Sequence, residues 1–487
     1  MFPYSTIGRF HLGLSRNEYS CVETVRYYLT QIEKNSRLNA FTAVYSAESL
    51  EKAARLDEKR KRGEPLKRLH GVIIAIKDVI CYRDHPVTAA SKILERFTSL
   101  YSATVVERLL EEDAIIIGSC NCDEFAMGST NENSAYGRVL NALDETKVPG
   151  GSSGGSAVAV QAGMCMAALG SDTGGSVRQP ADFCGILGFK PTYGAISRYG
   201  LVAYASSFDQ IGILANSTED ISLLFDVMNG SDEYDSTALP GKISAFPLQV
   251  DAKKKYRIAY FRDALDHRSL DVEIGRALTA TLEELKTAGH LVEAVDFSLI
   301  DYVVPAYYVL TTAEASSNLG RYDGIRFGLR ADPEKPIENI AAFYNRNRSK
   351  GFGTEVKRRI MLGTFVLSAG YYDAYYRKAQ QVRRMLVEST NQLFRDYDAI
   401  ILPTCPSTAF PLGDNTNDPV AVYLADIFTV FANLCGLPAI SLPFFKHSNG
   451  MPFGLQVMTN KKDDVTLLQL AAYLIENNKS RKMTGLI

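Results

Sequence analysis

Two segments rich in glycine and serine are the part of the chain best suited to chemistry. They read Gly150-Gly-Ser-Ser-Gly-Gly-Ser156 and Gly170-Ser-Asp-Thr-Gly-Gly-Ser176. Because glycine has no side chain, the backbone N–H groups of such loops can point at a bound anion or at an oxyanion that develops in a reaction. Apolar segments surround both loops closely, which argues against a flexible linker. The pattern predicts loops whose serine hydroxyls face a substrate.

Two other uses of such loops have less support. Neither segment contains G-x-x-x-x-G-K-[ST] or G-x-G-x-x-G, so a nucleotide-binding loop is disfavoured. Residues 150–154 and 151–155 match G-x-S-x-G, the nucleophile elbow of α/β-hydrolases, which needs a strand immediately before it and a histidine downstream. Residues 144–149 are polar and end in proline, and no downstream histidine lies in a distinctive context. The elbow is therefore the weaker interpretation.

Lys77 is the candidate base for a serine nucleophile. It follows Gly71-Val-Ile-Ile-Ala-Ile76, an apolar segment typical of a buried strand. Burial lowers the pKa of a lysine by up to several units, so a buried Lys77 could be neutral and accept a proton. A lysine at the end of a strand is by itself more often exposed to solvent. On this pattern alone both interpretations stay open.

The elements around these residues alternate between strands and helices. The first 60 residues or so have a helical pattern, with a capping box at Ser20 and Glu23. The remaining pattern predicts strands at 71–76, 114–117, 256–261, 291–297, 399–403, 439–443 and 455–458, helices at about 103–112, 271–288 and 465–475, and long tyrosine-rich helices over about 305–396.

This alternation predicts an α/β fold with one central mixed, largely parallel β-sheet covered by helices on both faces. Because similar strands occur before and after the long helices, we expect a single domain with a helical insertion. Its parts are an N-terminal helical segment (about 1–65), a core (about 66–300 and 397–487) and the insertion (about 303–396).

Composition is that of a soluble globular protein. The net charge of −2, from 53 basic and 55 acidic residues, disfavours a surface that binds nucleic acid by itself. The closest cysteines, Cys120 and Cys122, lack a second pair of ligands, so no metal site is predicted. Residues 1–14 lack the apolar core of a signal peptide, and the apolar run 157–169 is short of the ~20 residues that span a membrane. We expect a cytoplasmic protein.

Longer motifs around the two loops resemble those of the amidase signature family. They run from Gly150 to Gly163, from Leu169 to Ala181 and from Leu69 to Asp78. The resemblance implies the amidase-signature fold and a catalytic Ser–cis-Ser–Lys triad, whose members map onto Lys77, Ser152 and Ser176.

The same resemblance implies a role for each residue. Ser176 would attack the carbonyl carbon, and Ser152, after a cis peptide bond, would relay the proton to neutral Lys77. The oxyanion hole would consist of the backbone N–H groups of Thr173, Gly174 and Gly175. The neighbouring Ser153, Asp172 and Arg178 would hold the loops in shape, and only one of the adjacent hydroxyls of Ser152 and Ser153 would face the relay.

Further blocks resemble one branch of that family, the A subunits of glutamyl-tRNA(Gln) amidotransferases. They are Asp123–Gly128, Phe189–Gly200, Glu314–Leu319, Arg321–Arg326, Glu355–Phe365 and Gly370–Tyr376. The segment Val79–Pro86 departs from that branch, which usually has an asparagine and a glycine-containing loop after the lysine strand.

This likeness implies glutamine as the substrate and a heterotrimer completed by the tRNA-binding B and the small C subunits of the amidotransferase. The chain itself would need no cofactor. The B subunit would use ATP and Mg to convert Glu-tRNA(Gln) to Gln-tRNA(Gln) with the ammonia made here. The alternative is a stand-alone amidase acting on small amides, without a partner.

Glutamine carries a carboxylate and an ammonium beside its amide, so its site needs a cation and an anion. By position in that branch's motifs, Arg359 resembles the carboxylate binder and Asp426 the ammonium binder, while Tyr307, or Tyr308 in the alternative register, lines the pocket. The pattern alone would place residues 357–359 on a solvated helix face.

Overall fold

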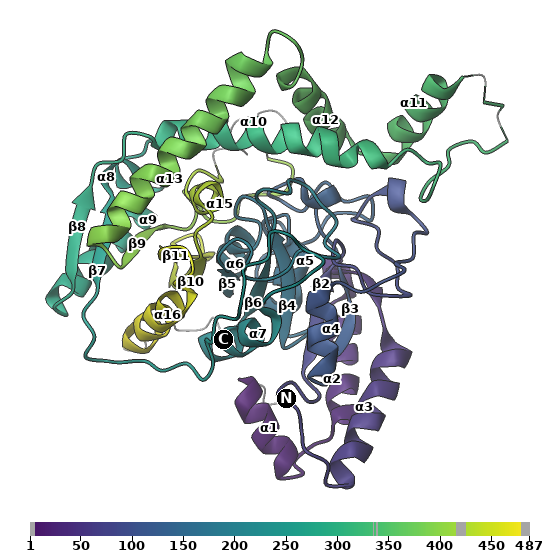
Figure 1. Cartoon of the computed structure of the whole chain (residues 1–487). Coiled ribbons are helices and arrows are strands. Elements are labelled where there is room, and N and C mark those ends of the chain that lie inside the picture. Colours follow the sequence, from purple (N-terminus) through teal and green to yellow (C-terminus); the bar gives the residue numbers. More distant parts are fainter. Residues whose placement is uncertain (1–4, 335, 338, 415–424, 479–487) are drawn as a thin grey trace.

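A single sheet of eleven strands runs through the part of the chain that the structure describes (Figure 1). The computed structural model describes residues 5–334, 336–337, 339–414 and 425–478. In chain order the strands are β1 (Phe41–Val44), β2 (Ile73–Lys77), β3 (Ile115–Cys120), β4 (Ala167–Asp172), β5 (Leu187–Lys190), β6 (Gln210–Ala215), β7 (Arg257–Phe261), β8 (Leu291–Val295), β9 (Ala399–Pro403), β10 (Ala439–Lys446) and β11 (Pro452–Met458).

The sheet is mixed, and its parallel pairs lie toward its two ends. The strand order is β1-β3-β2-β4-β6-β5-β10-β11-β9-β7-β8. Strands β3, β2 and β4 run parallel, as do β9, β7 and β8. The strands from β6 to β11 are antiparallel to their neighbours, and β10 and β11 are joined by a short connection that permits no other arrangement. The predicted α/β fold with a central mixed sheet is confirmed. The expectation that the sheet is largely parallel is wrong, because four of the described strand pairs are parallel and six are antiparallel, with the antiparallel strands forming its middle.

Helices flank this sheet. They are α1 (Ile7–Ser15), α2 (Cys21–Lys34), α3 (Ser46–Lys61), α4 (Thr104–Glu111), α5 (Gly154–Gln161), α6 (Arg178–Cys184), α7 (Thr218–Met228), α8 (Arg262–Leu265), α9 (Val272–Thr287), α10 (Ile300–Asn318), α11 (Ile340–Gly351), α12 (Thr354–Val366), α13 (Lys378–Asp396), α15 (Val430–Cys435) and α16 (Asp464–Asn478). Helices α10, α12 and α13 lie along one side of the molecule, while α11 stands apart from the sheet (Figure 1). Short helical turns include η2 (Lys92–Leu94) and η3 (Glu124–Ala126).

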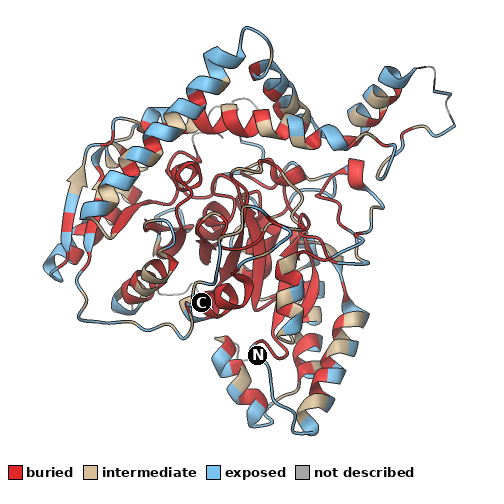
Figure 2. Cartoon of the chain, viewed as in Figure 1, coloured by how far each residue is buried: buried red, intermediate tan, exposed pale blue. Residues whose placement is uncertain are grey.

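Burial is concentrated in the middle of the sheet and in α5 and α6, which carry or adjoin the two glycine-serine segments (Figure 2). The apolar run 157–169 folds as the end of α5, a turn and the start of β4. The turn contains Gly163, whose φ of +64° is the left-handed conformation that glycine adopts at little cost. Among the described residues, the structure contains no helix with the length and apolar character needed to cross a membrane.

Candidate active site

Lys77 ends β2 and is buried beneath the two glycine-serine segments. Every residue of β2 is buried, because β3 and β4 pair with its two edges. The Lys77 Nζ donates hydrogen bonds to three hydroxyl oxygens, 2.7 Å from Ser152, 2.9 Å from Ser153 and 2.9 Å from Ser171. A lysine ammonium has three N–H donors, so these hydroxyls satisfy it without a carboxylate.

Burial lowers the pKa of Lys77 to about 8, because the charged form loses its hydration. The carboxylates of Asp123, Asp172 and Asp209 oppose that shift from a distance. A pKa near 8 leaves about a tenth of the lysine neutral at pH 7, enough to accept a proton from a serine. Lys77 is 0% exposed, so the solvent-exposed alternative for this strand-end lysine is wrong.

The first loop is fixed above Lys77 by contacts from two other segments. The peptide bond between Gly151 and Ser152 is cis, as the family resemblance implied. The Gly151 N–H donates to Gln179 Oε1 at 2.9 Å, and the Ser152 carbonyl accepts from the Asp123 N–H at 3.2 Å. A Cβ atom on Gly151 would lie 2.2 Å from Asp123 Oδ2, so only glycine fits this close approach.

Ser152 and Ser153 both direct their hydroxyls at Lys77, which corrects the expectation that only one of them does. The two hydroxyls differ in their other contacts. Ser153 Oγ donates to the carbonyl oxygen of Ser171 at 3.2 Å and accepts from the Ser171 N–H at 3.3 Å. Within the described residues, Ser152 Oγ has no hydrogen-bond partner other than Lys77. Ser153 is therefore tied to β4, whereas the proton of Ser152 is available for transfer.

Ser176 lies at the end of the second loop and is the most accessible of these serines. It is 9% exposed, against 0% for Ser152 and Ser153. Its carbonyl oxygen accepts from the Ser153 N–H at 3.2 Å, which joins the two loops through their backbones. No hydrogen bond within the described part of the chain engages the Ser176 hydroxyl, so it is open to an incoming carbonyl carbon.

A buried ion pair holds the second loop. Arg178 is fully buried and donates to both carboxylate oxygens of Asp172, at 3.1 and 3.0 Å. Its remaining N–H groups reach Gln456 Oε1 at 2.9 Å and Asn433 Oδ1 at 2.7 Å. Burial alone would raise the pKa of Asp172, but Arg178 holds it at about 2. Both residues are fully engaged, which fits their predicted structural role.

The N–H groups predicted for the oxyanion hole are not equivalent. The Gly175 N–H donates to Asp172 Oδ1 at 2.9 Å, so that donor is already committed. The N–H groups of Thr173 and Gly174 make no hydrogen bond within the described residues. The Gly174 carbonyl accepts from Thr429 Oγ1 at 2.7 Å, which orients the peptide. Thr173 and Gly174 are therefore the candidate oxyanion donors that the structure leaves available, whereas the Gly175 N–H is engaged by Asp172.

Arg359 points inward from α12, although the two residues before it, Lys357 and Arg358, are basic as well. It is 4% exposed, because the buried face of α12 carries Val356, Arg359, Gly363 and Val366. Its Nε donates to Glu355 Oε1 at 2.8 Å and its Nη1 donates to Tyr204 Oη at 2.8 Å. The expectation that residues 357–359 form a solvated face is wrong for Arg359, whereas Arg358 is half exposed.

Asp426 is a buried carboxylate close to these groups. Its Oδ2 accepts from Ser129 Oγ at 2.8 Å and from Tyr308 Oη at 3.2 Å. Burial raises the pKa of Asp426 to about 7, and the hydrogen bonds and Arg359 only partly offset this. The Arg359 guanidinium lies 5.4 Å from the centre of the Tyr308 ring, so a cation and a carboxylate both contact Tyr308.

Tyr307 links this pair to the second loop. A Cβ atom on Gly174 would lie 2.5 Å from Tyr307 Oη, so the phenol packs directly on the candidate oxyanion peptide. Tyr307 thus contacts Gly174, while Tyr308 contacts Asp426. Both tyrosines that the sequence offered for the pocket therefore lie at the site. Sequence reasoning missed the role of Ser171, although it lies in the second glycine-serine segment, because the pattern does not say which serine faces Lys77. It also missed Ser129 and Tyr204, because a single serine or tyrosine outside a motif gives no signal.

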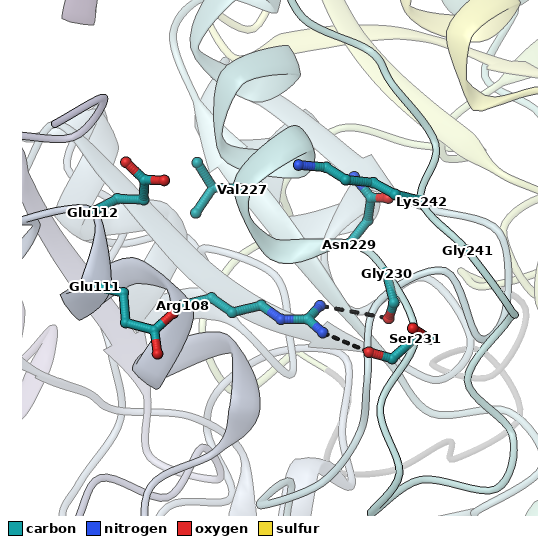
Figure 3. Close-up of a pocket in the computed structure, with 9 residues that line it drawn as sticks. All are labelled: Arg108, Glu111, Glu112, Val227, Asn229, Gly230, Ser231, Gly241 and Lys242. Carbon is teal, nitrogen blue, oxygen red and sulfur yellow. Dashed lines mark hydrogen bonds between the residues drawn. The ribbon is translucent and has the colours of Figure 1, made fainter.

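One surface hollow lies elsewhere, between α4 and the segment after α7. It has a volume of about 380 Å³ and contains Arg108, Asn229 and Lys242 among its lining residues (Figure 3). Arg108 donates to the carbonyl oxygens of Gly230, at 3.5 Å, and Ser231, at 2.7 Å, which ties it to the chain after α7. Since the hollow holds no nucleophile or base in a reactive arrangement, we assign it no chemistry.

The other motif-level alternatives find no support in this geometry. Residues 144–149, just before the G-x-S-x-G match, form no strand, and each of the six histidines forms hydrogen bonds away from the serines of the two loops. All eight cysteines are buried free thiols. Within the described ranges, no three His, Cys, Asp or Glu side chains gather as metal ligands would.

Comparison with known proteins decides the family. The amidase family model matches residues 23–468. The chain belongs to the amidase family. It is 48% identical over 97% of its length to a protein from Chlorobium phaeobacteroides that is named as the A subunit of glutamyl-tRNA(Gln) amidotransferase, covering 98% of that relative.

Solved structures agree with this assignment. A crystal structure of the A subunit of glutamyl-tRNA(Gln) amidotransferase from Thermotoga maritima matches with a TM-score of 0.79 and 38% identity, over 98% of this chain and 95% of the other. A crystal structure of an amidase matches with a TM-score of 0.82 and 28% identity, over 97% of this chain and 100% of the other. The protein is thus an enzyme of the amidase and amidotransferase class, as its motifs predicted.

Proposed function

We propose that this amidase is the glutaminase subunit of a glutamyl-tRNA(Gln) amidotransferase, a carbon–nitrogen ligase of protein biosynthesis that takes its nitrogen from glutamine. The observation that carries the proposal is a buried cation, Arg359, and a buried carboxylate, Asp426, which both contact Tyr308 next to the Ser–Lys site. Free glutamine needs that combination, because it carries a carboxylate and an ammonium beside its amide. The name and 48% identity of the Chlorobium relative support the same activity.

The proposed reaction starts with attack of Ser176 Oγ on the amide carbon of glutamine. Ser152 takes the proton of Ser176 and passes its own to neutral Lys77, which it contacts at 2.7 Å. The N–H groups of Thr173 and Gly174 stabilise the oxyanion, a contribution of about 3 kcal/mol per donor. The proton then returns to the leaving nitrogen, ammonia departs, and water attacks the acyl-enzyme by the same relay to release glutamate.

Substrate recognition uses the cluster beside the second loop. Arg359 binds the α-carboxylate, and Asp426 binds the α-ammonium with help from Ser129 and Tyr308. Tyr307 lies against the Gly174 peptide and borders the pocket there. Burial raises the pKa of Asp426 to about 7, and an ammonium bound beside it would lower that pKa and stabilise the carboxylate.

Ammonia released into water is protonated and lost to the reaction, so hydrolysis is useful only beside an acceptor. In the proposed enzyme this chain joins the tRNA-binding B and the small C subunits in a cytoplasmic heterotrimer. Glu-tRNA(Gln) is bound by the B subunit, which uses ATP and Mg to activate it for amidation. The chain itself supplies no nucleotide-binding loop and no metal cluster among its described residues.

The test compares glutamine hydrolysis and amidated tRNA for the chain alone and with the B and C subunits, Glu-tRNA(Gln) and ATP. We expect weak hydrolysis by the isolated chain, a higher rate in the complete mixture, and transfer of the glutamine amide nitrogen to tRNA-bound glutamate. A Ser176→Ala chain in the same mixture should give neither product from glutamine. Full activity of the lone chain toward varied small amides, indifferent to tRNA, would instead favour the stand-alone amidase.

A further inference from the structure

Glu124 is a buried acidic residue for which the reaction above has no use. It lies in η3, in the Asp123–Gly128 segment, and is 2% exposed. Burial raises the pKa of its carboxyl to about 7, even though two hydrogen-bond donors face it. Burying a carboxyl lowers the stability of the fold unless hydrogen-bond partners compensate for the lost hydration. Its partners therefore indicate what it does.

The carboxyl of Glu124 contacts the chain just before α12, directly through one oxygen and through Ser91 with the other. Oε2 accepts from the Gly353 N–H at 2.8 Å, and Gly353 is the residue that caps the start of α12. Oε1 accepts from Ser91 Oγ, which also lies 3.2 Å from the Gly351 carbonyl oxygen. The cap residue Gly353 has no side chain that could accept a hydrogen bond from the backbone N–H groups at the start of α12. Glu124, from another segment, accepts one of these hydrogen bonds instead.

The other end of α12 is fixed by close helix packing. A Cβ atom on Gly363 would lie 2.0 Å from the Thr312 carbonyl oxygen of α10, so the two backbones nearly touch there. Arg359 lies between these two fixed points and faces inward. A small rotation of α12 about the Gly363 contact would swing Arg359, and the contacts at residues 351–353 oppose such a rotation at the start of the helix.

The residue before Glu124 reaches the proton relay. The Asp123 N–H donates to the Ser152 carbonyl oxygen at 3.2 Å, while Glu124 binds the start of α12. We propose that Glu124 is a positioning residue that fixes α12 relative to the Ser152 loop and so aims Arg359 at the substrate carboxylate. The inference rests on the proposed function, because it takes Arg359 as the carboxylate binder.

The test uses the full-length chain and two amides that differ by one group. Glutamine has the α-carboxylate, and 4-aminobutanamide is the same molecule without it. We expect Glu124→Ala to raise the KM for glutamine on the order of tenfold with little change in kcat. The displaced Arg359 would bind the carboxylate less tightly in the ground state and in the transition state alike. The kcat/KM for 4-aminobutanamide should stay at the wild-type value. Glu124→Gln should restore the glutamine KM, because its amide can accept from Gly353 and donate to Ser91.

Gly353→Ala gives an independent perturbation that leaves the carboxyl in place. Its new Cβ would lie 2.4 Å from Glu124 Oε2, so the carboxyl must move away. We expect a higher glutamine KM for Gly353→Ala alone and no additional effect of that change in the Glu124→Ala background. If Glu124→Ala fails to fold, Gly353→Ala still measures the effect of breaking the contact between Glu124 and Gly353.

Arg359→Ala is the reference variant. If it raises the glutamine KM while Glu124→Ala and Gly353→Ala leave it unchanged, the role of Glu124 is refuted and the proposed function stands. If Glu124→Ala lowers activity on both amides equally, the residue acts on the whole fold and the inference is refuted as well. If Arg359→Ala itself leaves the glutamine KM unchanged, the assignment of the carboxylate binder fails, and the inference with it.

Discussion

Removal of the Ser171 hydroxyl should shift the pH dependence of amide hydrolysis toward lower pH. Lys77 Nζ donates to Ser171 Oγ at 2.9 Å. A hydrogen bond from a charged donor is worth about 1.5–3 kcal/mol and one from a neutral donor about 0.5–1.5 kcal/mol, so its loss disfavours the ammonium by about 1 kcal/mol. Since one pKa unit corresponds to about 1.36 kcal/mol, Ser171→Ala should lower the Lys77 pKa by about 0.7 from its present value of about 8.

The sign follows from the form of lysine that reacts. The base must be neutral, so the rate rises as pH increases through the Lys77 pKa and reaches a plateau above it. A fall of about 0.7 in that pKa raises the neutral fraction at pH 7 from about a tenth to about a third. The rate at pH 7, expressed relative to each enzyme's own plateau, should therefore rise about three- to fourfold in Ser171→Ala.

The assay is ammonia release from glutamine, with kcat/KM measured from about pH 6 to about pH 9, since kcat/KM reports ionisations of the free enzyme. Ser156→Ala is the matched control, because Ser156 is a buried serine of the first glycine-serine segment whose hydroxyl donates to the Leu169 carbonyl at 3.0 Å and does not contact Lys77. Its profile should coincide with that of the wild type. A Ser171→Ala profile that coincides with the wild type, or moves to higher pH, would show that the titrating base is not Lys77.

Three further outcomes test the remaining parts of the site. Ser176→Ala should abolish glutamine hydrolysis while thermal unfolding stays that of the wild type, and substantial activity in the folded variant would refute the nucleophile. Lys77→Arg should be nearly inactive at every pH, since arginine stays charged, and normal turnover would place the base elsewhere. Arg178→Ala should lower the free energy of unfolding by about 3–5 kcal/mol, measured in urea, because it leaves the buried Asp172 carboxylate unpaired. A loss below about 1 kcal/mol would contradict that account.

Patterns of buried strands and capped helices could be predicted well from the sequence. The strand predicted at 399–403 has the same bounds in the structure, and the capping box of Ser20 and Glu23 is present. Strands β5 and β6 gave no clear pattern. β5 has four residues and ends at the buried Lys190, and β6 contains Gly212, whose Cβ would lie 2.6 Å from the Phe189 carbonyl oxygen. Their strand state is imposed by neighbours that are distant in sequence.

The same distinction applies to the site. Glycine-rich loops and a lysine after an apolar strand carry local signals, so the candidate triad could be predicted from the sequence. No local signal distinguishes Arg359 from the basic residues before it, because its direction depends on how α12 packs on α10. Asp426 is buried with Ser129, which lies 297 residues away in sequence, and such proximity is a property of the fold alone. Sequence reasoning also did not foresee that Asp172 would occupy the N–H of Gly175.

The pairing of β5 with β10 brings together strands that the ribosome makes far apart in time. β5 ends at Lys190 and its partner begins at Ala439, so a ribosome needs on the order of tens of seconds to make the chain between them. Until then β5 has an open edge, and Arg178 lacks Asn433 and Gln456. The nascent chain thus carries its serines and its lysine before the contacts that hold the second loop can form, and during that interval its incomplete sheet presents an unpaired edge.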